Sequence, residues 1–193
     1  MQMVDRAERF DRLYRADIDP WGFRTTEYER QKYAATLAAM PRPHYEVAIE
    51  AGCSIGELTR KLAPRCDRII GIDVSEVALK EARTRHQDLP HLSFLRGELP
   101  ADWPAMEADL VILSEVLYFL TLPEIDALAE RIARHWKSQG HCILVNYLGR
   151  VPEKVQGEEA AARFIAAMGG ALHRPSIVTE QYRIDVLENG ENS

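Results

Sequence analysis

Carboxylates that follow apolar runs, together with one loop that contains two glycines, are the residues best suited to chemistry in this chain. The stretch Glu50-Ala51-Gly52-Cys53-Ser54-Ile55-Gly56 comes after an apolar run rich in β-formers and before a helical pattern. Glycine lets the backbone approach a ligand closely, and the start of a helix presents unpaired N–H groups. Asp73 follows the next apolar run, where its carboxylate can accept both hydroxyls of a ribose. This spacing predicts a nucleotide-type site.

Two later segments also place polar groups directly after apolar runs. Glu98, in Gly97-Glu98-Leu99, can accept from an adenine amino group, while the N–H of Leu99 can meet a ring nitrogen. Glu115 and Tyr118, in Ser114-Glu115-Val116-Leu117-Tyr118, can orient an acceptor amine, take its proton or shape its pocket. Each residue also has a structural interpretation, as a solvated loop glutamate, a helix-capping aspartate or a packed tyrosine.

The glycine-containing loop has two rival interpretations. A dinucleotide fingerprint G-x-G-x-x-G would need glycine at positions 54 and 57, which are Ser54 and Glu57. The same loop matches the G-x-S-x-G nucleophile elbow of hydrolases, with Ser54 as the nucleophile. That motif normally follows several strands and a glycine-rich oxyanion loop, which the upstream chain lacks, and chain order alone does not place a triad histidine. The hydrolase is therefore the less favoured alternative.

Apolar runs alternate with helical patterns from about residue 44 onwards. We expect strands at Val47–Glu50, Arg68–Ile72, Leu92–Leu95, Asp109–Leu113 and Ile143–Val145, with one or two closing strands at Ser176–Val186. The intervening helices are expected at Gly56–Ala63 and Ser75–Arg85, after a Thr121/Glu124 capping box, and at Glu158–Met168. This alternation predicts an α/β fold with a doubly wound, mostly parallel sheet, which binds ligands at the carboxyl ends of its strands.

The first 43 residues have a helical pattern instead. We expect one helix over residues 6–14 and a second from about Glu27 to Met40, begun by a Thr26/Glu29 capping box and ended by Pro41-Arg42-Pro43. The apolar stripe of the second helix is expected to comprise Tyr33, Leu37 and Met40, with the charges of Glu27–Lys32 facing solvent. Residues 1–43 should therefore form an N-terminal helical cap or lid, and residues 44–193 the α/β core.

Composition excludes several classes of partner. The chain has 193 residues and a net charge of −6, which argues against nucleic acid because phosphate binding needs clustered Lys and Arg. No apolar run approaches the roughly 20 residues that span a bilayer, and the N-terminus lacks the apolar core of a signal peptide. Three cysteines, Cys53, Cys66 and Cys142, have neither CxxC nor Cys/His ligand spacing. We therefore expect reduced thiols in a cytoplasmic protein, with no structural metal and no membrane partner.

The motifs taken together resemble a known family. Glu50–Gly56, Ile72-Asp73 and Ser114–Tyr118 resemble class I S-adenosylmethionine (SAM)-dependent methyltransferases. More narrowly, the chain from about Asp19 to Tyr147 is similar to the nodulation protein S (NodS) family. The segments that carry this similarity are Asp19-Pro20-Trp21, Tyr28-Glu29-Arg30, Gly52-Cys53, Leu62-Ala63-Pro64-Arg65-Cys66 and Glu115-Val116-Leu117-Tyr118. Ser54 departs from the usual glycine or alanine, and little matches after Tyr147.

The resemblance implies a Rossmann-like methyltransferase fold, SAM as cofactor and an N-methyltransferase acting on a glucosamine-type amine. It implies that Glu50 and the Gly52 loop meet the methionine end of SAM, Asp73 the ribose, and Glu98 and Leu99 the adenine. Trp21 and Arg30 would reach the cofactor from the lid. The candidate cofactor-binding residues are thus Trp21, Arg30, Glu50, Gly52, Ser54, Gly56, Asp73, Val74, Glu98, Leu99 and Ser114, and the candidate catalytic residues are Glu115 and Tyr118.

The expected function is transfer of a methyl group from SAM to an amine by in-line displacement, the acceptor being an amino sugar or a small amine. The alternative from a different class is a SAM- or nucleotide-binding module without catalysis. The identity of the acceptor, N- versus O-methylation and the oligomeric state stay open at this point.

Overall fold

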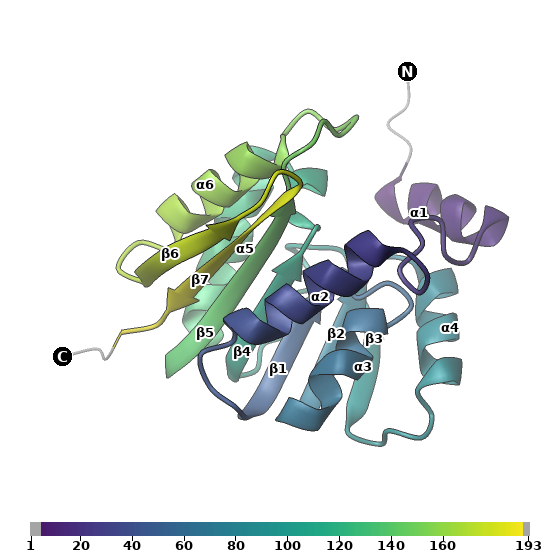
Figure 1. Cartoon of the computed structure of the whole chain (residues 1–193), viewed down its shortest axis with the longest axis horizontal. Helices are drawn as coiled ribbons and strands as arrows, with labels where there is room; N and C mark the ends of the chain where they lie inside the picture. Colours follow the sequence, from purple (N-terminus) through teal and green to yellow (C-terminus); the bar gives the residue numbers. More distant parts are fainter. Residues whose placement is uncertain (1–4, 191–193) are drawn as a thin grey trace.

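The computed structural model describes residues 5–190, with the backbone alone at positions 175 and 176. Its strands form one seven-stranded sheet in the order β3-β2-β1-β4-β5-β7-β6 (Figure 1). They are β1 (Tyr45–Ala51), β2 (Cys66–Asp73), β3 (Leu92–Arg96), β4 (Ala108–Ser114), β5 (Trp136–Tyr147), β6 (Leu172–Val178) and β7 (Tyr182–Glu188). Strands β1 to β5 pair in parallel, and β7 pairs antiparallel with both β5 and β6. The predicted doubly wound, mostly parallel sheet is confirmed.

Helices cover both faces of this sheet. They are α1 (Arg6–Ala16), α2 (Glu27–Ala39), α3 (Glu57–Leu62), α4 (Glu76–Arg85), α5 (Leu122–His135) and α6 (Gly157–Ala167), with short 3-10 turns η1 (Ala63–Arg65) and η2 (Leu117–Phe119). Helices α2, α3 and α4 lie on one face, and α5 and α6 on the other (Figure 1). Because both faces are covered, β4 is apolar along its centre: Val111 and Leu113 pack toward α5, and Leu110 and Ile112 toward α2.

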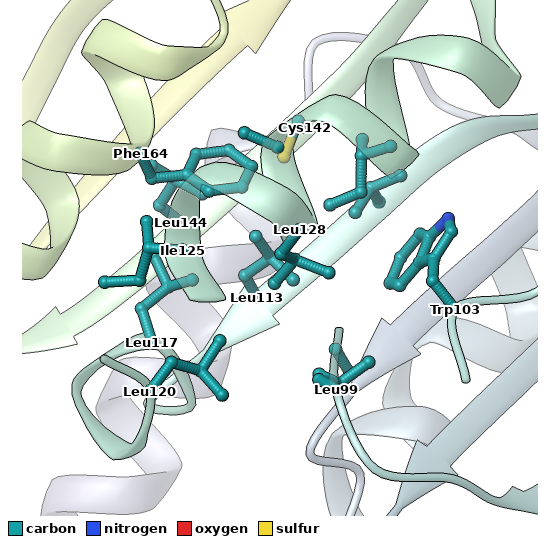
Figure 2. Close-up of a cluster of buried hydrophobic side chains, with 14 of the residues drawn as sticks. Leu99, Trp103, Leu113, Leu117, Leu120, Ile125, Leu128, Cys142, Leu144 and Phe164 are labelled. Atoms are coloured by element: carbon teal, nitrogen blue, oxygen red, sulfur yellow. The ribbon is translucent and has the colours of Figure 1, made fainter. Parts of the chain in front are cut away.

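The clearest sequence signal, the amphipathic helix after Thr121, forms as expected. The Thr121 hydroxyl caps the Glu124 N–H while the Glu124 carboxylate accepts from the Thr121 N–H, which completes the capping box. The apolar side of α5 is buried, and burial stabilises each large side chain by about 1.5–3 kcal/mol. Figure 2 shows this cluster, in which Leu128 of α5 lies close to Leu113 of β4.

Two predicted strand boundaries and one predicted capping box need correction. Strand β5 is much longer than Ile143–Val145, because its polar ends also pair with β4 and β7 on either side, and only its centre reads as an apolar run. The closing segment forms two strands, and the first begins at Leu172 rather than at residue 176. At the start of α2, Thr26 caps the Glu29 N–H at 3.4 Å, but the Glu29 side chain turns inward to Lys32, so the capping box is half formed.

Helix α1 lies beyond the carboxyl ends of the central strands, beside α4 (Figure 1). It begins at the capping residue Asp5 and buries Ala7, Phe10 and Tyr14, whereas Leu13 stays exposed. Both N-terminal helices therefore pack directly on the α/β part of the chain. The division into residues 1–43 and 44–193 stays a prediction, and residues 1–4 and 191–193 lie outside the described residues.

Candidate functional site

A cavity of about 460 Å³ opens at the carboxyl ends of β1, β2 and β4, where the strand order reverses between β1 and β4. Open α/β sheets place ligands at this kind of switch point. The candidate residues that line it are Trp21, Glu50, Gly52, Ser54, Asp73, Val74, Leu99, Ser114, Glu115 and Tyr118. The structure thus brings together most of the residues that the sequence singled out, although their roles toward a ligand stay predictions.

The loop after β1 has the backbone shape that its glycines predict. Gly52 and Gly56 have φ values of +70° and +81°, in the left-handed region, and Ser54 between them has +51°. A Cβ on Gly52 would lie 3.1 Å from Val116 in the loop after β4, so glycine lets the two loops meet at the switch point. Gly56 caps α3 but does not line the cavity, because its position faces His86, 2.8 Å from an added Cβ.

Asp73 and Glu50 place two buried carboxyl groups at the ends of β2 and β1. Asp73 accepts from the Ser54 N–H at 2.9 Å and the Ser75 N–H at 2.8 Å. Burial raises its pKa to about 6, although these hydrogen bonds oppose the shift. Glu50 accepts from the Thr59 hydroxyl at 2.5 Å, and burial raises its pKa to about 8. Because it accepts from the Ser54 N–H, the Asp73 carboxylate also holds Ser54 in its left-handed conformation.

Glu115 is the centre of a hydrogen-bonded cluster at the opposite wall. Its Oε1 accepts from Tyr28 at 2.8 Å and from Lys32 at 2.7 Å, and its Oε2 accepts from Tyr118 at 3.1 Å. Lys32 is also paired with Glu29 at 2.8 Å. Burial, and then the charge of Glu115, raise the pKa of both Tyr28 and Tyr118, so both hydroxyls stay protonated and donate. A carboxylate held in this way can receive a proton from a bound amine.

The sequence did not single out Tyr28, Glu29, Lys32 or Tyr14 as site residues. Glu29 and Lys32 are only 3% and 2% exposed, so the charges at the start of α2 do not form the expected solvated face. The spacing of Glu29, Lys32, Tyr33 and Thr36, which lie on one side of a helix, is the signal that marks a buried face. This pattern does not stand out in the sequence, because most of the residues that form the buried face are polar.

Besides Gly56, two further candidate cofactor residues, Arg30 and Glu98, lie outside the cavity. Arg30 is exposed and pairs with Glu27 at 2.6 Å, because the position next to Glu29 on a helix points away from the buried face. Glu98 is also exposed and pairs with Arg6 of α1 at 3.1 Å, although the neighbouring Leu99 does line the cavity. Helix α1 therefore contacts the loop after β3 through an ion pair.

Trp21 closes the cavity on the side of the N-terminal helices. Its ring lies 5.7 Å from that of Tyr14, 6.3 Å from that of Phe10 and 5.6 Å from that of Phe23, measured between centroids. It remains 42% exposed. An aromatic surface in this position can cover a flat ligand group.

The hydrolase interpretation has no support from the geometry around Ser54. The Ser54 hydroxyl accepts from Tyr14 at 2.5 Å, and no histidine is among the described residues that line the cavity. A nucleophile–base pair is therefore not assembled in this part of the chain. Within residues 5–190, no group of three or more His, Cys, Asp or Glu side chains is arranged to hold a metal ion. None of the helices described is long and apolar enough to cross a bilayer.

Comparison with known proteins shows the family of the chain. The family model for nodulation protein S (NodS) matches residues 6–156. The chain belongs to the NodS family. It is 34% identical to nodulation protein S of Bradyrhizobium diazoefficiens over 103 residues, which cover 53% of this chain and 49% of that protein. It is 30% identical to nodulation protein S of Rhizobium tropici over 141 residues, which cover 72% and 59%. The matched part thus spans 49% and 59% of the lengths of these two NodS relatives.

A solved NodS structure shows the same fold along nearly the whole chain. The NodS N-methyltransferase of Bradyrhizobium japonicum WM9, in complex with S-adenosyl-L-homocysteine (SAH), superimposes with a TM-score of 0.83 at 21% identity. The superposition covers 97% of this chain and 100% of the other. The predicted Rossmann-like methyltransferase fold with N-terminal helices is therefore confirmed.

Proposed function

We propose that this protein is a SAM-dependent N-methyltransferase that acts on an amine. The observation that carries the proposal is that Glu115 and its donors face the same cavity as Asp73 and Glu50. One wall offers carboxyl groups suited to a nucleoside and an amino acid, and the other offers a fixed proton acceptor. The solved NodS relative, an N-methyltransferase with SAH bound, supports the choice of cofactor and of reaction.

The proposed orientation of the cofactor follows the resemblance to SAM-dependent methyltransferases, and the positions of the strand ends support it. Glu50, Gly52 and Ser54 meet the methionine part, and the Asp73 carboxylate accepts the ribose hydroxyls beside Val74. Leu99 bounds the adenine, together with Trp21 on the outer side. Glu98, which is exposed and paired with Arg6, would have to turn into the cavity to reach the adenine amino group. Arg30, which lies outside the cavity, has no role in this assignment.

Bound SAM supplies a methyl group on a sulfonium, whose leaving group is a neutral thioether. The chain's own contribution is then mainly alignment, which is worth roughly 7–11 kcal/mol when the reacting atoms are in near-attack geometry. A protonated amine has no lone pair, so Glu115 receives its proton before attack while Tyr118 holds the carboxylate. Ser114 and Val116 close the wall beside the reacting atoms.

The charge of the lining supports the proposed acceptor class. Five acidic side chains and two basic ones line the cavity: Glu29, Glu50, Glu57, Asp73 and Glu115, against Arg6 and Lys32. Although Glu50, with a pKa of about 8, is mostly protonated at pH 7, the acidic side chains still outnumber the basic ones. This balance favours cations, which both SAM and a protonated amine are. An amino sugar or a small amine fits this chemistry, and the family membership favours the amino sugar.

Calorimetric titration of the purified protein with SAM and SAH, with NADH as the control, tests the cofactor. Micromolar binding of the SAM pair alone is expected, and Asp73→Ala should weaken it. Release of SAH in the presence of amino sugars and small amines then tests catalysis. Glu115→Gln and Tyr118→Phe should lose turnover but keep SAM binding. SAM binding without turnover on any acceptor would favour the non-catalytic binding module, and no binding would refute the proposal.

A further inference from the structure

A buried lysine contacts the proposed proton acceptor. Lys32 of α2 is 2% exposed, and its Nζ lies 2.7 Å from Glu115 Oε1 and 2.8 Å from Glu29 Oε1. The ammonium also lies 4.8 Å from the centroid of the Tyr28 ring. Burying a lysine costs free energy unless it is paired, and here it is paired twice. The pairing with Glu29 leaves Lys32 fixed against Glu115.

The donors around Glu115 leave one acceptor position open. A carboxylate has about four lone-pair sites, two on each oxygen. Tyr28 and Lys32 occupy those of Oε1, and Tyr118 occupies one of the two on Oε2. The remaining site is on Oε2, beside the Tyr118 hydroxyl.

The backbone conformation of Glu115 is also fixed. Glu115 has a φ of +53°, and its N–H donates to the Val145 carbonyl at 2.7 Å. The main chain thus fixes the position from which the Glu115 side chain extends. Tyr28 and Lys32 of α2 fix the position of its Oε1.

We propose that Lys32, held by Glu29, is a positioning residue that turns Oε2 of Glu115 toward the acceptor amine. The inference rests on the proposed methyl transfer. The amine's N–H bond breaks and an O–H bond forms at Oε2, and the freed nitrogen lone pair forms the C–N bond to the methyl group. The C–S electron pair leaves with the thioether. Lys32 takes no part in the proton transfer itself and acts only through Glu115.

Lys32→Met alone does not test this role, because it leaves Glu29 buried without a counter-charge and destabilises the fold. The informative variant is the double substitution Glu29→Gln with Lys32→Met, which removes both charges together. Its melting temperature is expected to stay close to that of the unaltered protein. Lys61→Met, an exposed lysine on the neighbouring helix α3, is the matched control.

The experiment measures kcat at saturating SAM and the Kd for SAM, with and without Glu115→Gln. In the unaltered background the double substitution should lower kcat by about tenfold or more, while the Kd changes less than about threefold. In the Glu115→Gln background it should lower kcat by less than about twofold, because the residue it positions is already disabled.

Two results would overturn the inference: an unchanged kcat in the double variant, or the same loss of kcat in both backgrounds. The first makes the pair merely structural, and the second means that Lys32 acts without Glu115. Failure of the unaltered protein to bind SAM would refute the proposed function itself, and the inference with it.

Discussion

The hydroxyl of Tyr14 donates to the hydroxyl of Ser54 across 2.5 Å, which joins the first helix of the chain to the loop after β1. The two residues are 40 positions apart, and both line the cavity. This hydrogen bond, together with the packing of Phe10 and Tyr14 against Ile55, therefore links helix α1 to the predicted cofactor loop.

Tyr14→Phe should weaken SAM binding because it removes this bond without changing the ring. A hydrogen bond contributes about 0.5–1.5 kcal/mol net, so the Kd should rise about 2- to 10-fold. Calorimetry measures it. Tyr45→Phe is the control, since its hydroxyl bonds to the Arg42 N–H at the opposite end of β1. An unchanged Kd for Tyr14→Phe would show that the bond does not hold the loop for the ligand.

Glu50→Gln should stabilise the ligand-free protein more at high pH than at low pH. Burial raises the pKa of Glu50 from 4.5 to about 8, so the folded state binds the proton more tightly than the unfolded chain. Stability is then lost as the pH rises between these two values, by up to about 1.4 kcal/mol per pH unit. Glutamine at position 50 removes this loss of stability. The difference in melting temperature between Glu50→Gln and the unaltered protein should therefore widen from pH 5 to pH 8. Glu46→Gln, an exposed position on the same strand, is the control; a gap that is independent of pH would contradict this.

Binding of SAM should release a proton at pH 7. In the ligand-free protein Glu50, with a pKa of about 8, is mostly protonated at pH 7. A cationic ligand beside it favours the ionised carboxylate. Calorimetric titration in buffers of different ionisation enthalpy measures this release. We expect about half a proton or more per SAM bound, because binding of the cation lowers the pKa of Glu50. Glu50→Gln should release clearly less. Equal release from both proteins would place the cation of the ligand away from Glu50.

Gly52→Ala should lower both stability and affinity for SAM. Its φ of +70° costs an alanine roughly 1–2 kcal/mol, and the new Cβ would press on Val116 at 3.1 Å. Denaturant unfolding measures the first effect and calorimetry the second. Gly190→Ala, where an added Cβ meets nothing within 4 Å, is the matched control. Identical midpoints for the two variants would mean that the loop can adjust its backbone freely.

The strand ends were predictable because parallel strands bring their carboxyl ends to one edge. Glu50, Asp73 and Glu115 each follow an apolar run, and all three line the cavity. Long-range pairing was not predictable in this way. Lys32 looked like part of a solvated face because it lies among charged residues, and only the position of Glu115, 83 residues later, gives it a buried partner. Arg30 was placed at the site by resemblance, but the helix turns it outward.

Two of the three donors to Glu115, Tyr28 and Lys32, belong to one helix that precedes every strand, whereas Asp73 and Glu50 terminate central strands. The wall that faces the proposed acceptor is thus assembled from α2 and from the loop after β4, two segments that are far apart in the chain. Substitutions at Tyr28 or Lys32 should therefore change acceptor preference while leaving the strand ends that carry Asp73 and Glu50 unchanged.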